Sequence, residues 1–310
     1  MPEQKKIVIL GGGYGGVETA KLLNKRFKKD SGVSITLIDR NPYHTLMTEL
    51  HEVAGSRTEA EAVQINFQRI FGGSRVNVVV DNIESIDFKE KHLFSCGAQY
   101  DYDYLVMGTG GEPEFFGTPG VQENCFTLWS LDDALRIREH VDNQFVEAAR
   151  EINPVLRKRL LTFAVAGAGF TGIELVGELM ERANTLCRKY NLDRDEVRIV
   201  VIEAKDCILP ILEAKPRAAA HRYLLKKKVE VLVNAPIVKA DAQAIYLQDG
   251  TKVEAGTFVW TCGIHASSFT AKLELTKGHI SRDKTAMITP LGLHGHAEFW
   301  CEDDDVKEVN

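Results

Sequence analysis

KIVILGGGYGGVE, residues 6–18, is the segment on which the fold of this chain is built. Its apolar run at residues 7–10 is short and rich in β-branched side chains, which is typical of a strand buried on both faces of a parallel sheet. Apolar residues then recur at helical intervals as far as Phe27, so the stretch predicts a strand, a tight turn and a helix. The turn carries three glycines in the spacing G-x-G-x-x-G, namely Gly11, Gly13 and Gly16.

A dinucleotide explains why glycine is needed at each of these places. One glycine allows the tight turn, the next lets backbone N–H groups approach a pyrophosphate, and the third lets the helix pack closely on the strand. We therefore expect Tyr14 and Gly15, at the start of the helix, to lie in the site. Residues 33–40, VSITLIDR, predict a second strand that ends in Asp39, followed by Arg40. Asp39 is placed to hydrogen-bond an adenosine ribose.

The same design recurs in LLTFAVAGAGFTGIELVGELM, residues 160–180, which predicts a second strand, glycine turn and helix. The matching strand is VRIVVIEA, residues 197–204, and it ends in Glu203 where the first copy ends in Asp39. Two complete copies in one chain predict two dinucleotide sites. The residues expected in the second turn are Gly167, Gly169, Phe170, Thr171 and Gly172.

Two dinucleotides suggest one tightly held redox cofactor and one exchangeable nicotinamide, and FAD with NADH is the simplest pair. A second glycine turn, residues 108–111, is expected to approach the first site, so we assign FAD to the first copy. The fold class is α/β, with two Rossmann-like domains and the NADH domain inserted into the FAD domain. We expect an FAD-binding domain at 1–114, an NADH-binding domain at 115–259, and a return to the first domain at 260–310, after a hairpin turn at Asp249 and Gly250.

Composition restricts the function further. With 310 residues, 44% hydrophobic and 26% charged, the sequence is typical of a globular protein with full cores. The net charge of −6 gives no reason to expect a nucleic-acid partner. The N-terminus runs straight into the first strand, which indicates no signal peptide and a cytoplasmic protein. Six cysteines form no C-x-x-C pair and no zinc-type cluster, so we expect reduced thiols, no metal site and no dithiol chemistry.

The chain resembles the two-dinucleotide-binding-domain flavoproteins, and within them the type II NADH:quinone oxidoreductases. The resemblance covers about residues 5–265 and implies non-covalent FAD, oxidation of NADH by hydride transfer to the flavin, and reoxidation by a membrane quinone without proton pumping. It leaves open a homodimer and peripheral attachment to the inner face of the cell membrane. The motifs that carry it are GGGYGG, DRNPYH, VMGTGG, AGAGFTGIELVGEL, IEAKDCILP and WTCGI.

By position, the resemblance implies that FAD contacts Gly11, Gly13, Gly16, Asp39, Thr109 and Gly110. It implies that NADH contacts Gly169, Gly172, Glu203 and Gly263. Glu174 matches the family's buried glutamate, near the nicotinamide and the quinone. The residues alone leave another interpretation open, because the helix dipole favours glutamate in a first turn, and Glu18 occupies the same place after Gly16.

The C-terminal sequence departs from the family pattern. A third FAD motif, a strand ending in Gly-Asp, is expected after residue 263. The sequence there reads AEFWCEDDDV, residues 297–306, so either Glu302 and Asp303 form a degraded version or the motif is missing. We expect the chain to be truncated, without the family's quinone segment and membrane-binding C-terminus.

The sequence is also compatible with two other functions. Sulfide:quinone oxidoreductases share the fold but need cysteines that face the flavin, and Cys125 and Cys262 are the candidates. A redox-linked protein that senses NADH without efficient turnover is the second. Tyr43, His44 and His51 could face a cofactor, although surface or capping roles are the simpler interpretation of the histidines.

Overall fold

The computed structural model describes residues 4–273 and divides them into two compact units. The first unit comprises the described parts of Met1–Thr45, Gln64–Glu112 and His265–Asn310. The second comprises Leu46–Val63 and Pro113–Ile264, so it is inserted into the first along the chain. The predicted third FAD motif around Asp303 lies outside the described residues.

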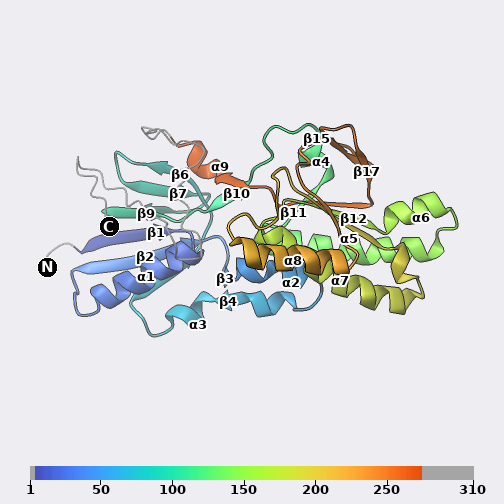
Figure 1. Ribbon diagram of the computed structural model, residues 1–310. Coiled ribbons are helices and arrows are strands. Elements are labelled where there is room, and N and C mark those ends of the chain that lie inside the picture. The colour runs from blue at the N-terminus through green and yellow to red at the C-terminus, as the bar shows by residue number, and fades with distance from the viewer. Residues whose placement is uncertain (1–3, 274–310) are drawn as a thin grey trace. The chain divides into compact units, whose positions relative to one another are not determined.

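A parallel sheet forms the centre of the first unit (Figure 1). The predicted strand of the opening motif lies in its interior, paired with the strand that ends in Asp39, which confirms the first copy. Its four strands, in the order β5-β2-β1-β9, are β5 (Val76–Val80), β2 (Val33–Asp39), β1 (Lys5–Leu10) and β9 (Tyr104–Met107).

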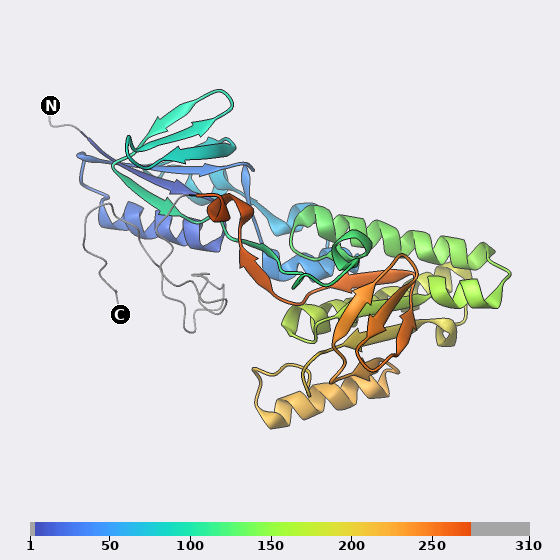
Figure 2. The same cartoon turned by 90° about the horizontal axis from the view of Figure 1, so that it is seen from above.

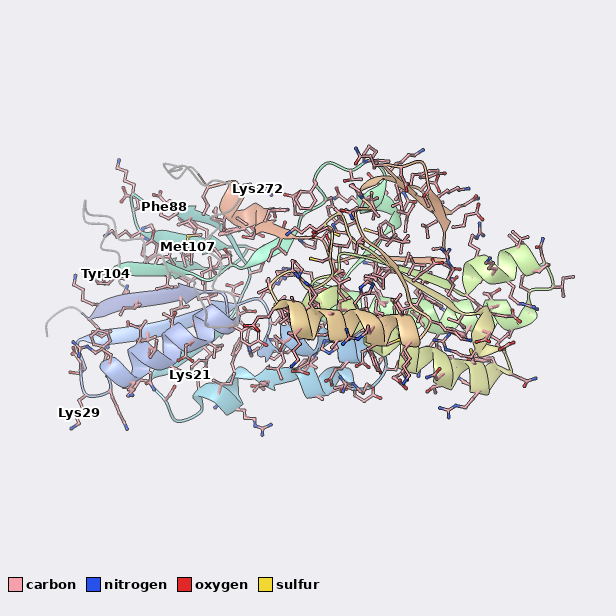
Figure 3. The ribbon with its side chains drawn as sticks, in the orientation of Figure 1. Lys21, Lys29, Phe88, Tyr104, Met107 and Lys272 are labelled. Atoms are coloured by element: carbon pink, nitrogen blue, oxygen red, sulfur yellow. The ribbon has the colours of Figure 1, made fainter. Side chains whose placement is uncertain are left out.

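The two faces of this sheet are covered differently. Ile9 and Leu37 point to the face that packs on α1 (Tyr14–Arg26) and α3 (Phe67–Phe71). Lys21 and Lys29 are exposed, and both side chains point away from the sheet (Figure 3). Alternate residues such as Val8 point to the opposite face. That face is covered by the antiparallel strands β6 (Ile83–Asp87), β7 (His92–Ser95) and β8 (Gln99–Asp101). Smaller elements of this unit are β3 (Tyr43–Thr45), β4 (Gln64–Asn66) and α9 (Ser268–Ala271).

The second unit repeats the same sheet order and adds an edge strand. Its five parallel strands follow the order β11-β18-β12-β13-β14. They are β11 (Phe126–Thr127), β18 (Thr257–Trp260), β12 (Thr162–Ala166), β13 (Arg198–Ile202) and β14 (Glu230–Leu232). The second predicted copy is therefore confirmed, with β12, β13 and β18 in the places of β1, β2 and β9.

Helices cover one face of the second sheet and a small antiparallel sheet covers the other. The long helix begins with a reciprocal capping box formed by Ser130 and Asp133. The predicted hairpin at Asp249 and Gly250 is confirmed, because β16 and β17 pair on either side of it. The helix α8 packs beside the edge strand β14 (Figure 2). The elements are α4 (Val121–Asn124), α5 (Leu131–Arg150), α6 (Pro154–Leu160), α7 (Phe170–Tyr190), α8 (Ala214–Lys226), β15 (Ile237–Ala240), β16 (Ala244–Leu247) and β17 (Lys252–Glu254).

The division by packing differs from the expected domain limits in one segment. Residues 46–63 were expected within the first domain, yet they belong to the second unit. The reason is hydrophobic: Leu50, Val53 and Val63 are almost fully buried in the same core as α5 and α7. The segment contains α2 (Leu50–Ala54) and two 3-10 turns, Met47–Glu49 and Ala60–Val63. A third 3-10 turn is Arg194–Glu196. The strands β10 (Gly111–Pro113) and β19 (Ile264–Ala266) lie where the chain passes from one unit to the other.

None of the helices within residues 4–273 is long and apolar enough to cross a membrane.

Candidate dinucleotide-binding sites

The first and third glycines of each motif are required by the backbone itself. A Cβ placed on Gly16 would lie 1.8 Å from the carbonyl oxygen of Gly11, and a Cβ on Gly172 would lie 1.9 Å from that of Gly167. Helix and strand could not approach this closely with any side chain present. Gly11 and Gly167 also have φ values of +103° and +93°, a region that only glycine adopts without strain.

The middle glycine of each motif faces open space instead. A Cβ on Gly13 or Gly169 would meet no described atom within 4 Å. These residues are the N-caps of α1 and α7, with φ and ψ of −69° and −170° in one and −72° and −173° in the other. As far as the described residues go, neither helix has a side-chain cap or an acidic residue in its first turn. Each turn thus presents open space at a partly positive helix N-terminus, which fits a pyrophosphate.

The acidic residue of each copy holds its own glycine turn. Asp39 Oδ2 accepts a hydrogen bond from the N–H of Gly12 at 2.6 Å, and Glu203 Oε2 accepts one from the N–H of Ala168 at 2.8 Å. The other oxygen of each accepts the N–H two residues later, at 2.7 Å and 2.9 Å. A carboxylate has about four acceptor sites, so sites remain for a ribose hydroxyl. The carboxylates both shape the turn and can bind a dinucleotide.

In the first unit, the segment after β9 lies against the glycine turn. A Cβ on Gly11 would be 2.2 Å from the carbonyl oxygen of Gly108, which confirms the expected approach of the second glycine turn. Thr109 is already engaged, because its hydroxyl lies 2.8 Å from the Thr270 hydroxyl and accepts from Ser267 at 3.2 Å. Gly110 has φ of +69° and is open on its Cβ side among the atoms described.

In the second unit, the segment after β18 takes the corresponding place. The Thr261 hydroxyl donates to the carbonyl oxygen of Ala166 at 2.7 Å. A Cβ on Gly167 would lie 2.9 Å from this hydroxyl oxygen and 3.1 Å from Cys262 Sγ. Gly263, with φ of +94°, follows at the same edge of the sheet.

Arg40 and Thr171 are exposed, and Phe170, the first residue of α7, is 40% exposed. Tyr14 packs edge-on against the ring of His44, with ring centroids 4.7 Å apart. Gly15 is half-buried beside it in the first turn of α1.

His44 has a role that the sequence interpretation missed. It is buried, and its Nδ1 donates to the carbonyl oxygen of Gly12 at 3.0 Å. The expectation of a surface or capping histidine is therefore wrong for His44. No local sequence pattern predicts this contact, because His44 lies in β3 and Gly12 in the glycine turn, 32 residues apart in the sequence.

Glu174 differs from its counterpart Glu18 in its surroundings. Its Oε2 lies 3.7 Å from His51 Nδ1, and its side chain is 48% exposed. Partial burial raises the pKa of Glu174, His51 opposes this shift, and Glu49 adds to it. The helix-dipole interpretation of Glu174 is wrong, because α7 begins at Phe170 and its first turn contains no acidic residue.

The cysteines considered for sulfide chemistry are poor nucleophiles. Burial raises the pKa of Cys125 and of Cys262 to about 12 in each case. Both thiols pack against the apolar core between the sheet and β15–β17. At neutral pH they are therefore protonated, whereas sulfur exchange needs a thiolate. Across residues 4–273 no three His, Cys, Asp or Glu side chains gather in a group that could hold a metal ion.

These features define a protein with two dinucleotide-binding units of like design. The family model described as pyridine nucleotide-disulphide oxidoreductase matches residues 5–289. A type II NADH:quinone oxidoreductase of Staphylococcus epidermidis is 31% identical over 307 residues, which cover 97% of this chain and 74% of that protein.

Two solved structures share the fold. The structure of NDH2 from Plasmodium falciparum in complex with NADH matches with a TM-score of 0.78 and 23% sequence identity. The match covers 86% of this chain and 56% of the NDH2 chain. The sulfide:quinone oxidoreductase of Aquifex aeolicus has a TM-score of 0.68 and 18% identity, over 86% and 60% of the two chains. The chain belongs to the pyridine nucleotide-disulphide oxidoreductase family and, within it, to the type II NADH:quinone oxidoreductases.

Proposed function

We propose that this chain oxidises NADH and delivers the electrons to a quinone, with FAD held by the first unit and NADH by the second. The observation that carries the proposal is the paired turn: each unit has a middle glycine that opens on free space at a helix N-terminus, beside a carboxylate that can accept from a ribose. One such site serves a resident cofactor and the other an exchangeable carrier.

In the first unit, the backbone N–H groups after Gly13 would hold the FAD pyrophosphate, and Asp39 would bind the adenosine ribose. Thr109 and Gly110 lie at the same edge of the sheet and would approach the flavin half. When bound, FAD supplies the two-electron acceptor for the hydride of NADH. The residues of the chain bind and orient both molecules.

In the second unit, Gly169 would lie under the NADH pyrophosphate, and Glu203 would accept from the 2′-hydroxyl of the adenosine ribose. The same carboxylate would repel a 2′-phosphate, which favours NADH over NADPH. Gly263 would lie beside the nicotinamide half. Phe170 and Thr171 start α7 and would contribute N–H groups next to the pyrophosphate.

We assign Glu174 to the delivery of electrons to the acceptor. Burial raises the pKa of Glu174 although His51, 3.7 Å away, opposes the shift, so Glu174 holds a proton at higher pH than an ordinary glutamate. It lies near the end of the helix that opens on the dinucleotide. A quinone takes up protons as it is reduced, so a carboxyl group in this position can supply one.

We further propose peripheral association with the inner face of the cell membrane, a cytoplasmic location and a homodimer, which the family resemblance alone motivates. Flotation with anionic vesicles tests the first, and analytical ultracentrifugation of the flavin-loaded protein tests the last.

The function is tested by the visible spectrum of the flavin-loaded protein before and after anaerobic NADH, followed by a soluble quinone. We expect NADH to bleach the flavin and the quinone to restore its colour, with repeated turnover in the steady state. Bleaching by sulfide instead of NADH would favour the sulfide:quinone alternative, against which the protonated state of Cys125 and Cys262 counts. Binding of NADH without turnover by any acceptor would favour a sensor.

A further inference from the structure

Phe116 lies outside the glycine motifs and combines two unfavourable features. Its side chain is 63% exposed, and its backbone has φ of +53°, a region that bulky residues rarely adopt. Gly117, which follows, has φ of +64°, and the N–H of Thr118 donates to the carbonyl oxygen of Phe115 at 2.9 Å. This is a tight turn with two left-handed central residues, where asparagine and glycine are the favoured types.

The turn is held in place by Glu114. Its Oε1 accepts the N–H of Phe116 at 2.6 Å, its own N–H donates to the carbonyl oxygen of Gly263 at 3.1 Å, and its carbonyl oxygen accepts from Trp260 Nε1 at 2.8 Å. The ring of Phe116 therefore lies over Gly263: a Cβ on that glycine would be 3.0 Å from Phe116 Cζ. An exposed aromatic ring is thus fixed in a strained turn by specific bonds.

The ring lies at the place in the second unit where a ligand is expected. In an open parallel sheet, ligands bind outside the carboxyl ends of the strands where the strand order reverses. Here that point lies between β12 and β18, because the chain moves from β12 to β13 on one side and later returns to β18 on the other. The loops that follow these two strands meet at Gly167 and Thr261, and Gly263 and Phe116 continue the same edge.

The position of Glu203 decides which half of the dinucleotide Phe116 meets. Glu203 follows β13, on the side of β12 away from β18, so the adenosine half lies on that side. With the pyrophosphate over Gly169, the nicotinamide half extends toward β18 and Gly263.

We infer that Phe116 is a binding residue for the nicotinamide half of NADH, with its ring stacked against one face of the nicotinamide. The inference rests on the proposed function and names a contact within its NADH site. The aromatic ring, the strained turn and the absence of a side chain at Gly263 then have one common explanation.

The test uses Phe116→Asn, which removes the ring and suits the left-handed turn, Phe116→Tyr, which keeps the ring, and Tyr223→Ala as a control. Tyr223 is a 52% exposed aromatic on α8, which packs beside β14 at the other end of the sheet. Binding of NAD⁺ and of ADP-ribose, which lacks the nicotinamide, is measured by calorimetry on the flavin-loaded protein, together with the midpoint of thermal unfolding.

We expect Phe116→Asn to weaken the binding of NAD⁺ about 3- to 10-fold and to leave the binding of ADP-ribose unchanged. The midpoint of thermal unfolding should stay the same or rise. Phe116→Tyr and Tyr223→Ala should bind both ligands as the unaltered protein does. If Phe116→Asn bound both ligands equally more weakly, or bound neither more weakly, the inference would be overturned. The proposed function would still stand if the unaltered protein oxidised NADH. Failure of the unaltered protein to bind NAD⁺ would overturn the proposed function as well.

Discussion

The glycine turns of the two units are alike in their backbones and different in what surrounds them. Both open at a middle glycine with nearly the same dihedral angles, and both are tied by a carboxylate at 2.6 Å and 2.8 Å. Around the first turn, Phe67 occupies the space where a side chain on Gly12 would lie, and His44 bonds the Gly12 carbonyl. Around the second, Ala168 takes the place of Gly12.

The features that both units share are those that any bound dinucleotide requires, whereas the features that differ can select one particular dinucleotide. The shared glycines and carboxylates make the cradle. The two units differ in other residues, among them Glu203 in place of Asp39 and a glutamate beside His51 in the second unit. In the proposed function, these differences would separate the site of an exchangeable carrier from that of a resident cofactor.

The largest effect is expected at the third glycine of each motif. Gly16→Ala and Gly172→Ala would each place a methyl group within 2 Å of a backbone oxygen, so we expect a loss of about 1–3 kcal/mol or more of unfolding free energy. Gly177→Ala, on the same helix as Gly172 but with open space on its Cβ side among the described atoms, should instead gain about 0.5–1 kcal/mol. Denaturant unfolding compares the three, and a similar result for Gly172 and Gly177 would contradict the close approach.

The acidic residues should act on different ligands. Glu203→Gln removes a negative charge that would face a 2′-phosphate, and like charges brought together cost several kcal/mol, so we expect discrimination against NADPH to fall about tenfold or more. Asp39→Asn, the matched change in the first unit, should lower flavin content and leave that discrimination as it was. Ratios of kcat/KM for NADH and NADPH decide between these outcomes, and a change in the ratio with Asp39→Asn would show that the sites are assigned the wrong way round.

A smaller effect is expected from the titration of Glu174. Its pKa is raised in the folded protein, mainly by burial, so the folded state binds this proton more tightly than the unfolded state. The stability that this proton contributes is present at low pH and is lost as the pH rises from the ordinary value of 4.5 through the folded pKa.

The side chain of Glu174→Gln does not titrate. As the pH rises through this window, the variant should therefore become more stable relative to the unaltered protein, and above the window the difference in unfolding free energy should stay constant. The advantage should be modest because the side chain is 48% exposed. Unfolding midpoints between pH 4 and pH 8 measure it, with Glu18→Gln as the control. If the stability advantage of Glu174→Gln shrank as the pH rose, the effect of His51, which lowers the pKa of Glu174, would outweigh the effect of burial, which raises it.

Much of this structure could be predicted from the sequence because the signals are local. The runs at residues 7–10 and 162–166, the glycine spacings and the Ser130 cap each determine their own element. The place of residues 46–63 could not be predicted, since Leu50 and Val53 recur at the same helical spacing whichever core buries them. The same holds for His44, whose partner lies 32 residues away in the sequence, and for Phe116, whose left-handed backbone no spacing predicts.

Substitutions at the two middle glycines decide whether the first unit holds FAD and the second holds NADH. Gly13→Val and Gly169→Val place the same side chain in the same open space of each turn, so neither should disturb the fold. The measurement is flavin content after purification together with NAD⁺ affinity. We expect Gly13→Val to lose the flavin, and Gly169→Val to keep a full complement of flavin and lose NAD⁺ binding. Equal loss of flavin from both variants, with unchanged circular dichroism, would contradict the claim.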